Sequence, residues 1–172
     1  MSMDFALDPE MNVERHEELV RLWTDVSNAG GAVGFVPPVT SADIRPQADE
    51  HLAAVAEGRF RMLAALQGGK LVGTAFFSFN THRLMRHWAW LVTVMVHPSL
   101  QGRGYGAELL RAAERRGREF GLAGIRLGCR SGLGLERFYA SAGYKEVGRV
   151  PAAIRVSPGD DRDDVTMWLP LV

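Results

Sequence analysis

Apolar residues recur along this chain at two spacings, one typical of helices and one typical of strands. The first part of the chain has the helical spacing twice and predicts two amphipathic helices. The first helix follows Asn12, a favourable N-cap residue, and the second covers residues 41–57 and ends at Gly58. The apolar positions that we expect these helices to bury are Leu19, Leu22, Trp23 and Val26 in the first, and Leu52, Val55 and Ala56 in the second.

The middle of the chain changes to strand-like patterns. Residues 60–66 and 71–79 are rich in apolar and aromatic side chains, and the two glycines in residues 67–70 supply the tight turn of an antiparallel hairpin. Residues 88–96 are apolar at nearly every position, which is typical of a strand covered on both faces. We therefore expect residues 88–96 to lie in the middle of a sheet.

Helices and strands alternate in the last part of the chain. The pattern predicts a helix after the central strand, a short strand at 125–129, a second helix that ends at Gly143, and closing strands at 145–156 and 164–169. The apolar faces of the two helices are Leu109, Leu110, Ala113 and Phe120 in the first, and Leu135, Phe138, Tyr139 and Ala142 in the second. No repeat or linker interrupts the pattern, so we expect one domain over residues 1–172.

Charge and composition exclude several classes of function. The 20 basic and 20 acidic side chains cancel, so the chain lacks the electrostatic footprint expected for binding nucleic acid or an anionic membrane. No apolar stretch is long enough to span a bilayer, and residues 1–8 lack the features of a signal peptide, so we expect a cytoplasmic protein. The lone Cys129 excludes an internal disulfide, and the scattered histidines offer no metal-ligand spacing, so we expect no bound metal.

The segment between the central strand and the following helix is rich in glycine, at positions 102, 104 and 106. A strand that leads through such a turn into a helix gathers unpaired backbone N–H groups at the positive end of the helix dipole, and this arrangement binds phosphate. Gly104 and Gly106 lack the Cβ atoms that would hold a pyrophosphate away from these amides. The spacing differs from the dinucleotide fingerprint, because Ala107 and Glu108 stand where a third glycine is expected, and no Lys-Ser or Lys-Thr pair completes a P-loop.

The residues from Gln101 to Gly106 match the pattern Q/R-x-x-G-x-G/A and resemble the pyrophosphate loop of the GNAT N-acetyltransferase superfamily. Residues 30–35 and 136–151 further resemble the tabtoxin-resistance acetyltransferases. The order of the predicted elements is also similar to the GNAT fold if a weak first strand lies near Phe5. The resemblance implies a single α/β (α+β) GNAT fold, whose mixed, mostly antiparallel sheet of about seven strands is flanked by about four helices. It also implies a splay, meaning a divergence, between the fourth and fifth strands.

The resemblance implies an enzyme that moves an acetyl group from acetyl-CoA to a primary amine of a small molecule, by direct attack in a ternary complex. The end of the fourth strand would pair with the pantetheine arm, and an N–H there would stabilise the negative charge that develops on the thioester oxygen. The glycine-rich turn would hold the pyrophosphate, with the Arg103 side chain either nearby or simply exposed to solvent. The implied cofactor-binding residues are Met95, Val96, Gln101, Gly102, Arg103, Gly104, Tyr105, Gly106 and Ala107.

Tyr139 lies where the superfamily commonly keeps the general acid that protonates the departing thiolate, so the resemblance implies a catalytic role for it. Its place on an apolar helix face beside Phe138 is equally typical of a core tyrosine. The base is not evident, because Trp90 and Gly128 occupy the positions at which relatives carry a glutamate and an aspartate. The candidates that remain are His97, Glu136, His87, a water chain, or an acceptor amine of low pKa.

Two other interpretations stay open from the sequence. A sensor that binds acetyl-CoA without turnover would have the same loop, and the missing glutamate favours it. An acetyltransferase that acts on protein N-termini or lysines would also have the same loop. The sequence also leaves open whether the protein forms a homodimer.

The acceptor pocket is expected between residues 30–39, the third and fourth strands, and the closing hairpin. Phe35, Trp88 and Trp90 are available to line it, and we expect the two tryptophans to face opposite sides of the sheet, so that at least one packs in the core. Residues 30–39 hold no carboxylate, which predicts an acceptor with an apolar or aromatic body rather than a polycation. Cys129 is expected to be a small buried hydrophobe rather than a nucleophile.

Overall fold

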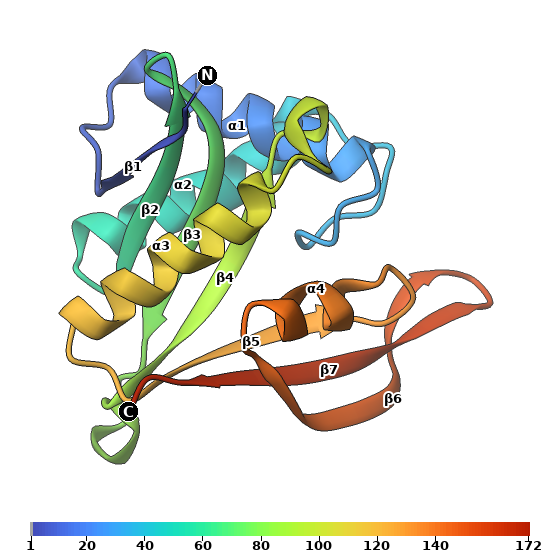
Figure 1. Ribbon diagram of the computed structural model, residues 1–172. Coiled ribbons are helices and arrows are strands. Elements are labelled where there is room, and N and C mark those ends of the chain that lie inside the picture. Colours follow the sequence, from blue (N-terminus) through green and yellow to red (C-terminus); the bar gives the residue numbers. More distant parts are fainter. Residues whose placement is uncertain (1) are drawn as a thin grey trace.

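A seven-stranded sheet in the order β1-β2-β3-β4-β5-β7-β6 runs through the computed structural model, which describes residues 2–172 (Figure 1). Neighbouring strands pair antiparallel except β4 and β5, which are parallel. The elements are β1 (Asp4–Leu7), α1 (Val13–Asn28), α2 (Ser41–Ala56), β2 (Phe60–Gln67), β3 (Lys70–Phe79), β4 (Trp88–Val96), α3 (Tyr105–Glu119), β5 (Gly124–Arg130), α4 (Leu135–Ser141), β6 (Lys145–Ser157) and β7 (Asp160–Pro170), with 3-10 turns η1 (Arg83–Met85) and η2 (Pro98–Leu100). The predicted mixed, mostly antiparallel sheet with four helices is confirmed. Met1 lies outside the described residues. It is the first residue of the predicted domain and of residues 1–8, in which we expected no signal peptide.

The predicted elements are all present, and the weak first strand is β1. Asn12 caps α1, since its side chain accepts a hydrogen bond from the Arg15 N–H at 2.8 Å. A capping box between Thr40 and Asp43 begins α2. The predicted buried face of α2 is wrong in part: Ala56 is exposed, and the residues that α2 buries are Ile44, Ala48, His51 and Ala54.

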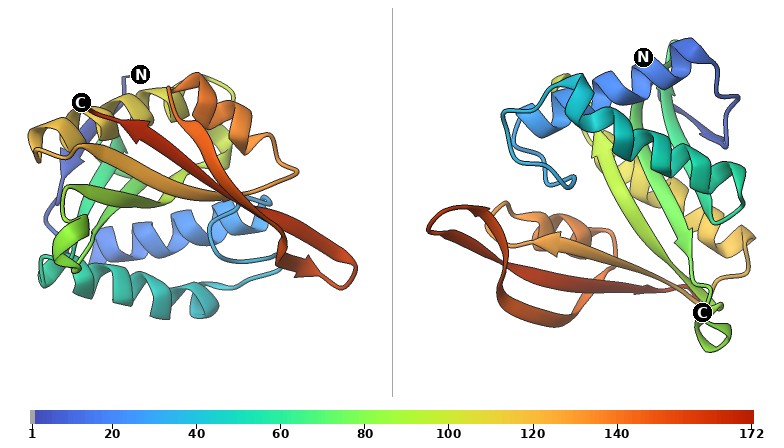
Figure 2. Two further views of the ribbon diagram at one scale, coloured as in Figure 1. Left: turned by 90° about the horizontal axis from the view of Figure 1, so that it is seen from below. Right: turned by 180° about the vertical axis from the view of Figure 1, so that it is seen from behind.

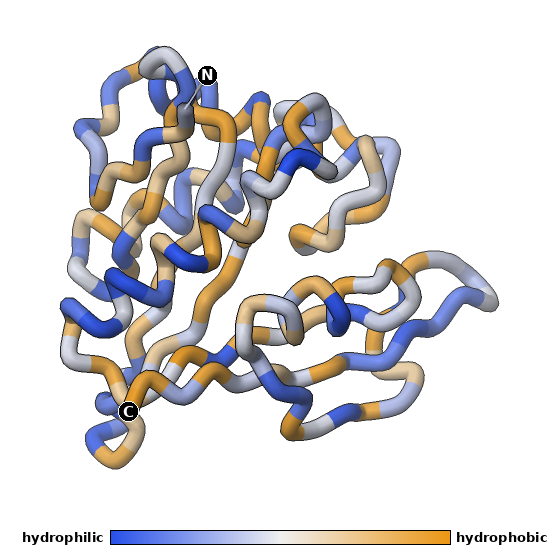
Figure 3. Tube along the Cα trace, viewed as in Figure 1, coloured by the Kyte–Doolittle hydropathy of each residue, from blue (hydrophilic) through white to orange (hydrophobic). Residues whose placement is uncertain are grey.

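The helices lie on both faces of the sheet. α1 and α2 cover β2, β3 and β4 from one side, whereas α3 and α4 lie on the opposite side (Figure 2). In the described part of the chain, no helix covers the α1/α2 side of β5, β7 and β6. Apolar residues follow the strands and the inward sides of the helices, as Figure 3 shows for β4. The two cores include Leu19, Trp23, Ile44 and Phe76 under α1 and α2, and Leu109, Leu110, Ile125 and Tyr144 under α3 and α4.

β4 and β5 pair over only three residues and then diverge. The last pair is Trp90 with Arg126, after which β4 stays on β3 as far as Val96, and β5 stays on β7 as far as Arg130. Figure 1 shows the opening between the two halves of the sheet. The divergence expected between the fourth and fifth strands is therefore confirmed.

Gly124 lies where the two halves of the sheet meet, paired with both Trp88 and Pro170. The indole of Trp168 covers it so closely that a Cβ atom on Gly124 would lie 2.2 Å from Cζ2 of that ring. Absence of a side chain at this position is thus a steric requirement of the junction.

None of the helices within residues 2–172 is both long and apolar enough to cross a lipid bilayer.

We expect Gly124→Ala to lower the free energy of unfolding by about 1–3 kcal/mol, because the added methyl group must displace the Trp168 ring in a packed core. Gly148→Ala on the exposed strand β6, where a Cβ would meet nothing within 4 Å, is the matched control and should change stability by less than about 0.5 kcal/mol. Urea unfolding followed by circular dichroism measures both. Equal stability of the two variants would contradict the steric explanation.

Candidate active site

The loop from β4 to α3 presents backbone N–H groups that no side chain caps. Gly102 and Gly104 have φ values of 76° and 85°, in the left-handed region, and the space where their Cβ atoms would lie is open. Gly104 is the N-cap of α3, and no side chain accepts a hydrogen bond from the first amides of this helix. The first helical hydrogen bond runs from the Glu108 N–H to the Gly104 carbonyl, at 3.1 Å. The amides of Gly106 and Ala107 precede that bond and have no acceptor within the helix. This geometry suits an anion.

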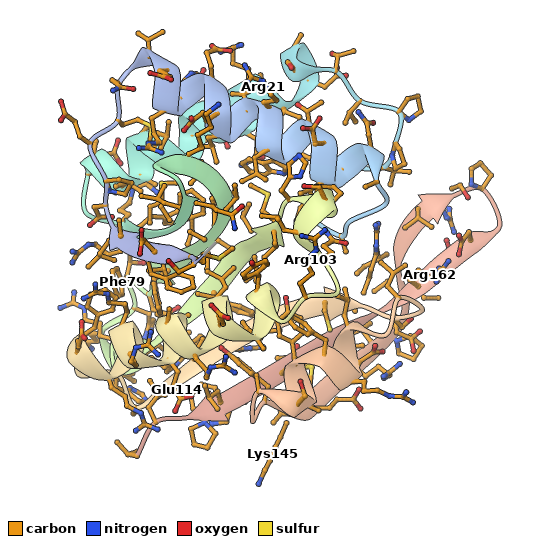
Figure 4. All side chains as sticks on the ribbon, turned by 45° about the horizontal axis from the view of Figure 1, so that its top comes forward. Arg21, Phe79, Arg103, Glu114, Lys145 and Arg162 are labelled. Carbon is orange, nitrogen blue, oxygen red and sulfur yellow. The ribbon has the colours of Figure 1, made fainter. Side chains whose placement is uncertain are left out.

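Gly106 also has a packing role that the sequence did not indicate. A Cβ atom on it would lie 3.0 Å from Cζ of Phe138, so its lack of a side chain lets the start of α3 approach α4. Gln101 also has a structural contact, because its side-chain Nε2 donates to the Val96 carbonyl at 3.0 Å and ties the loop to the end of β4. Arg103 is exposed and lies beside the start of α3 (Figure 4).

A cavity of about 610 Å³ extends from this loop into the opening between β4 and β5. Its walls include the loop, the end of β4, and residues 29–33 between α1 and α2. It brings together all the predicted cofactor-binding residues except Arg103 and Tyr105, which do not line it. Tyr139 and Gly128 form its inner end.

A second cavity, of about 360 Å³, adjoins the first from the α1/α2 side of the sheet. Both are lined by Val94, Gly128 and Tyr139, so the two meet in the gap between the diverging strands. A third cavity of about 360 Å³ also reaches Gly128 and is lined by Arg130, Arg155 and Asp164. The remaining side chains of the second cavity include Trp23, Phe35, Gln47, His51, Trp90 and Thr93.

Tyr139 is 7% exposed and lines both of the adjoining cavities. Its ring packs against Phe138 and Tyr144, and no residue within 2–172 forms a hydrogen bond with its hydroxyl. Burial raises the pKa of the Tyr139 hydroxyl well above its usual range, and the nearby Cys129 thiol adds to the shift. The hydroxyl therefore stays protonated at neutral pH and can donate a proton into the cavity.

β4 contains a β-bulge, at which Thr93 and Val94 together lie opposite Ala75 of β3. Thr93 has a φ of 51°, which is uncommon for a β-branched residue. Two hydrogen bonds hold it in this conformation. The Thr74 hydroxyl donates to the Thr93 carbonyl at 2.8 Å, and the Thr93 hydroxyl lies 2.8 Å from Nε2 of His51.

His51 is a buried titratable residue that the sequence analysis did not single out. It is 9% exposed on α2, and burial lowers the pKa of its imidazole below the usual range. A signal was present, because His51 lies at helical spacing from Ile44 and Ala48 on the buried face. The rings that surround it belong to Trp23, Phe60 and Phe76.

The three residues considered from sequence as a base do not line the two adjoining cavities. His97 bonds to Asp25 at 3.3 Å, and Glu136 pairs with Arg149 at 3.3 Å. His87 is exposed in the turn before β4. None of the three is placed to take a proton from a group in these two cavities.

The prediction that Trp88 and Trp90 face opposite sides of the sheet is wrong. Residues two apart on a strand share a face, and the two rings lie 5.7 Å apart on the α1/α2 side. The guanidinium carbon of Arg126 lies 4.4 Å from the centre of the Trp90 ring, which itself lines the second cavity. Trp88 packs at the closed end, 8% exposed.

Cys129 is buried at the wall of the first cavity. Burial, with a smaller effect from the negative charge of Glu136, raises the pKa of its thiol to about 11. This is the environment of an inert thiol, as expected. Within residues 2–172, no cluster of histidine, cysteine or acidic side chains is arranged to hold a metal ion.

The known proteins that this chain resembles are acetyltransferases. The sequence profile of the Acetyltransferase (GNAT) family matches residues 32–144. A proposed acetyltransferase from Salmonella typhimurium, solved with its cofactor acetyl-CoA, has a TM-score of 0.76 at 19% identity, over 100% of this chain and 95% of that one. A ribosomal-protein-alanine N-acetyltransferase from Brucella melitensis has a TM-score of 0.76 at 22% identity, over 99% and 100%.

A proposed phosphinothricin N-acetyltransferase has a TM-score of 0.79 at 16% identity, over 99% of each chain. At such identities the similarity to these solved structures concerns the fold alone. No match is found among curated proteins.

We expect iodoacetamide to alkylate Cys129 at pH 8 at least about 100-fold more slowly than free cysteine, since only the thiolate reacts and its fraction is small. The rate should rise with pH up to about 11, where half of the thiol is ionised. Mass spectrometry of the folded protein measures the rate, and the unfolded protein serves as the control. Alkylation at the rate of free cysteine would show that Cys129 is an activated nucleophile.

Proposed function

Since this chain belongs to the acetyltransferase (GNAT) family, we propose that it binds acetyl-CoA and transfers the acetyl group to a primary amine of a small molecule. The observation that carries the proposal is the pair of cavities that meet at Tyr139, in the gap between β4 and β5. One cavity leads from the uncapped start of α3, and the other from the opposite face of the sheet. Two substrates can thus enter from different sides and meet within one protein, as direct transfer requires.

The first cavity suits the donor. The amides from Gly102 to Ala107, with the positive end of the α3 dipole behind them, would bind the pyrophosphate, with the exposed Arg103 beside it. The edge of β4 that turns away from β3 lacks a strand partner beyond Trp90, so the backbone near Met95 and Val96 can pair with the pantetheine amides. Gln101 would hold the loop against the strand. The Salmonella relative was solved with acetyl-CoA, which supports the choice of donor.

Tyr139 would act as the general acid. The thioester supplies an activated acyl group, and its sulfur must leave as a thiolate or a thiol. Tyr139 lines the cavity, and its hydroxyl has no hydrogen-bond partner among residues 2–172. Burial raises the pKa of this hydroxyl further above neutral pH, so the hydroxyl carries its proton. Donating its proton to the leaving sulfur would lower the barrier to expulsion.

The second and third cavities suit an acceptor with an apolar or aromatic body. Trp23, Phe35 and Trp90 line the second cavity, and no carboxylate lines it. In the third cavity Arg155 is paired with Asp161, which leaves Arg130 and Asp164 as the other charged side chains of the lining. A polycationic amine would meet no excess of negative charge there, whereas a neutral or aromatic body would pack against the rings of the second cavity.

A small-molecule acceptor also fits the loop between α1 and α2. The Trp23 Nε1–H donates to the Val33 carbonyl at 2.9 Å, and Asn28 and Val39 exchange two hydrogen bonds of 2.9 Å. These contacts tie down the loop, of which residues 32–35 form a wall of the acceptor cavity. A protein substrate would need an open groove there. The alternatives are transfer to a protein N-terminus or lysine, and an acetyl-CoA sensor. The Brucella relative is named for alanine of a ribosomal protein, which favours the first of them. A cytoplasmic location and one domain over residues 1–172 are part of the proposal.

The proposal is tested by thiol release from acetyl-CoA with a panel of primary amines, beside calorimetry with CoA, ATP and NAD. We expect CoA to bind, ATP and NAD not to bind measurably, and arylalkylamines to be better acceptors than spermine or an aminoglycoside. A protein that ignores acetyl-CoA would contradict the function, and a preference for spermine would contradict the acceptor class.

Two valine variants test the loop within this experiment. Gly104→Val forces a β-branched residue into left-handed backbone at the start of α3, and should weaken CoA binding about tenfold or more. Gly159→Val places the same strain, at a φ of 81°, in the distant turn between β6 and β7. It should leave CoA affinity unchanged.

We expect Tyr139→Phe to lower kcat about 100-fold while the CoA dissociation constant changes less than about twofold, since only the proton donor is lost. Tyr144→Phe is the matched control, because the Tyr144 hydroxyl is also buried without a partner among residues 2–172 but does not line the cavities. Its kcat should equal that of the unmodified protein. Steady-state kinetics and calorimetry measure both variants. An unchanged kcat in Tyr139→Phe would mean that Tyr139 is a core residue only.

A further inference from the structure

We propose that His51 and Thr93 form the proton relay that deprotonates the acceptor amine, an inference that rests on the proposed function. The supporting observation is the hydrogen bond between the Thr93 hydroxyl and His51 Nε2 at the wall of the acceptor cavity. Among residues 2–172, no carboxylate lines either of the two adjoining cavities. His51, on α2, lines the second of them.

The conformation of Thr93 is built to hold this contact. The bulge in β4 gives Thr93 a positive φ, and the buried Thr74 hydroxyl fixes its carbonyl. The Thr93 hydroxyl is then 2.8 Å from the imidazole of α2, although Thr93 belongs to a central strand. Strained backbone of this kind persists where the surroundings over-determine it, and it concentrates at functional sites.

The relay requires the His51 tautomer that carries its hydrogen on Nδ1. Nδ1 faces Gln47, one helical turn earlier, whose side-chain Nε2 lies 3.4 Å away and whose backbone carbonyl can accept that hydrogen. Nε2 then has a free lone pair that accepts from the Thr93 hydroxyl. The relay therefore points from the cavity, through Thr93, to His51.

The surroundings of His51 keep its imidazole neutral. The groups that face the ring are Trp23 from α1, Phe60 from β2, Phe76 from β3, Thr93 from β4, and Gln47 and Glu50 from its own helix. Of these, Glu50 carries the one charge, and its effect on the His51 pKa is smaller than that of burial. The ring is thus a ready acceptor at neutral pH, and its capacity is lost as the pH falls through the lowered pKa.

The relay and Tyr139 lie on opposite sides of the opening. His51 reaches the second cavity from the α1/α2 face, and Tyr139 reaches it from α4 on the other face. Val94, the residue after Thr93, lines both adjoining cavities. An amine in the second cavity would therefore lie between Thr93 and Tyr139, which both line it.

The proton transfers balance over the whole reaction. The ammonium group of the acceptor gives one proton to the Thr93 hydroxyl oxygen, while the Thr93 hydroxyl hydrogen moves to His51 Nε2. The freed nitrogen lone pair forms the C–N bond, the C–S bond breaks, and the Tyr139 proton goes to sulfur. The nitrogen loses its second proton through the same relay after His51 has released the first to solvent, and solvent reprotonates Tyr139.

The test compares variants on two acceptors of different basicity. His51→Gln keeps an N–H that can bond Thr93 but removes the proton acceptor, and Thr93→Val keeps the β-branched shape but removes the hydroxyl. Both should lower kcat about 100-fold with an alkylamine, which binds as ammonium, and less than about fivefold with an arylamine, which is already neutral at pH 7. Thr93→Ser keeps the hydroxyl and should retain kcat within about threefold.

The pH profile supplies a second readout. With the alkylamine, kcat of the unmodified protein should fall below a pKa lower than that of a free histidine, and this limb should be absent in His51→Gln. His82→Gln, in the exposed turn before η1, is the matched histidine control and should keep the full profile.

Equal losses with both amines, or a Thr93→Ser variant as slow as Thr93→Val, would overturn the relay and leave His51 a packing residue. If His51→Gln does not fold, Thr93→Val and Thr93→Ser decide the question. An unmodified protein that acetylates neither amine would instead contradict the proposed function, so the two failures are distinguishable.

Discussion

The loss of pairing between β4 and β5 is the constraint on which the rest of this structure depends. A buried strand edge with unpaired N–H and C=O groups is costly unless something else bonds it. Here the pairing ends at Trp90 and Arg126, and the Trp168 ring over Gly124 holds the junction at which it ends. The opening beyond the junction leaves polar backbone of β4 facing a cavity, where a ligand with amide groups can form the missing hydrogen bonds.

Burial at this opening acts in opposite directions on two titratable groups. It raises the pKa of the Tyr139 hydroxyl and lowers the pKa of the His51 imidazole, because in each case the charged form is the one that loses hydration. Burial therefore favours the neutral form of both groups, of which one holds its proton and the other can take one. Neither group needs an ion pair for this.

The sequence predicted what local patterns determine. The bounds of β4, the glycine-rich turn and the place of Tyr139 on its helix follow from periodicity and from short motifs, and each is confirmed as a position in the structure. The bulge at Thr93 could not be predicted, because it depends on the register between β4 and β3. His51 lies on an apolar helix face, where a histidine that merely packs gives the same pattern. Gly106 matched the loop motif, but the motif could not show that a side chain at this position would collide with Phe138 of α4.

The contact between Trp90 and Arg126 bears on which group could act as the base. The Arg126 guanidinium stacks on the rings of both Trp88 and Trp90, within 4.4 Å of the latter. A carboxylate at position 90 would pair with this cation, which would lower the carboxylate pKa and weaken it as a base. An aromatic ring at that position instead accommodates the arginine and shapes the acceptor cavity. A proton acceptor that works beside Arg126 must come from another element, and among the side chains that line the second cavity His51 is the one whose ring is neutral and basic.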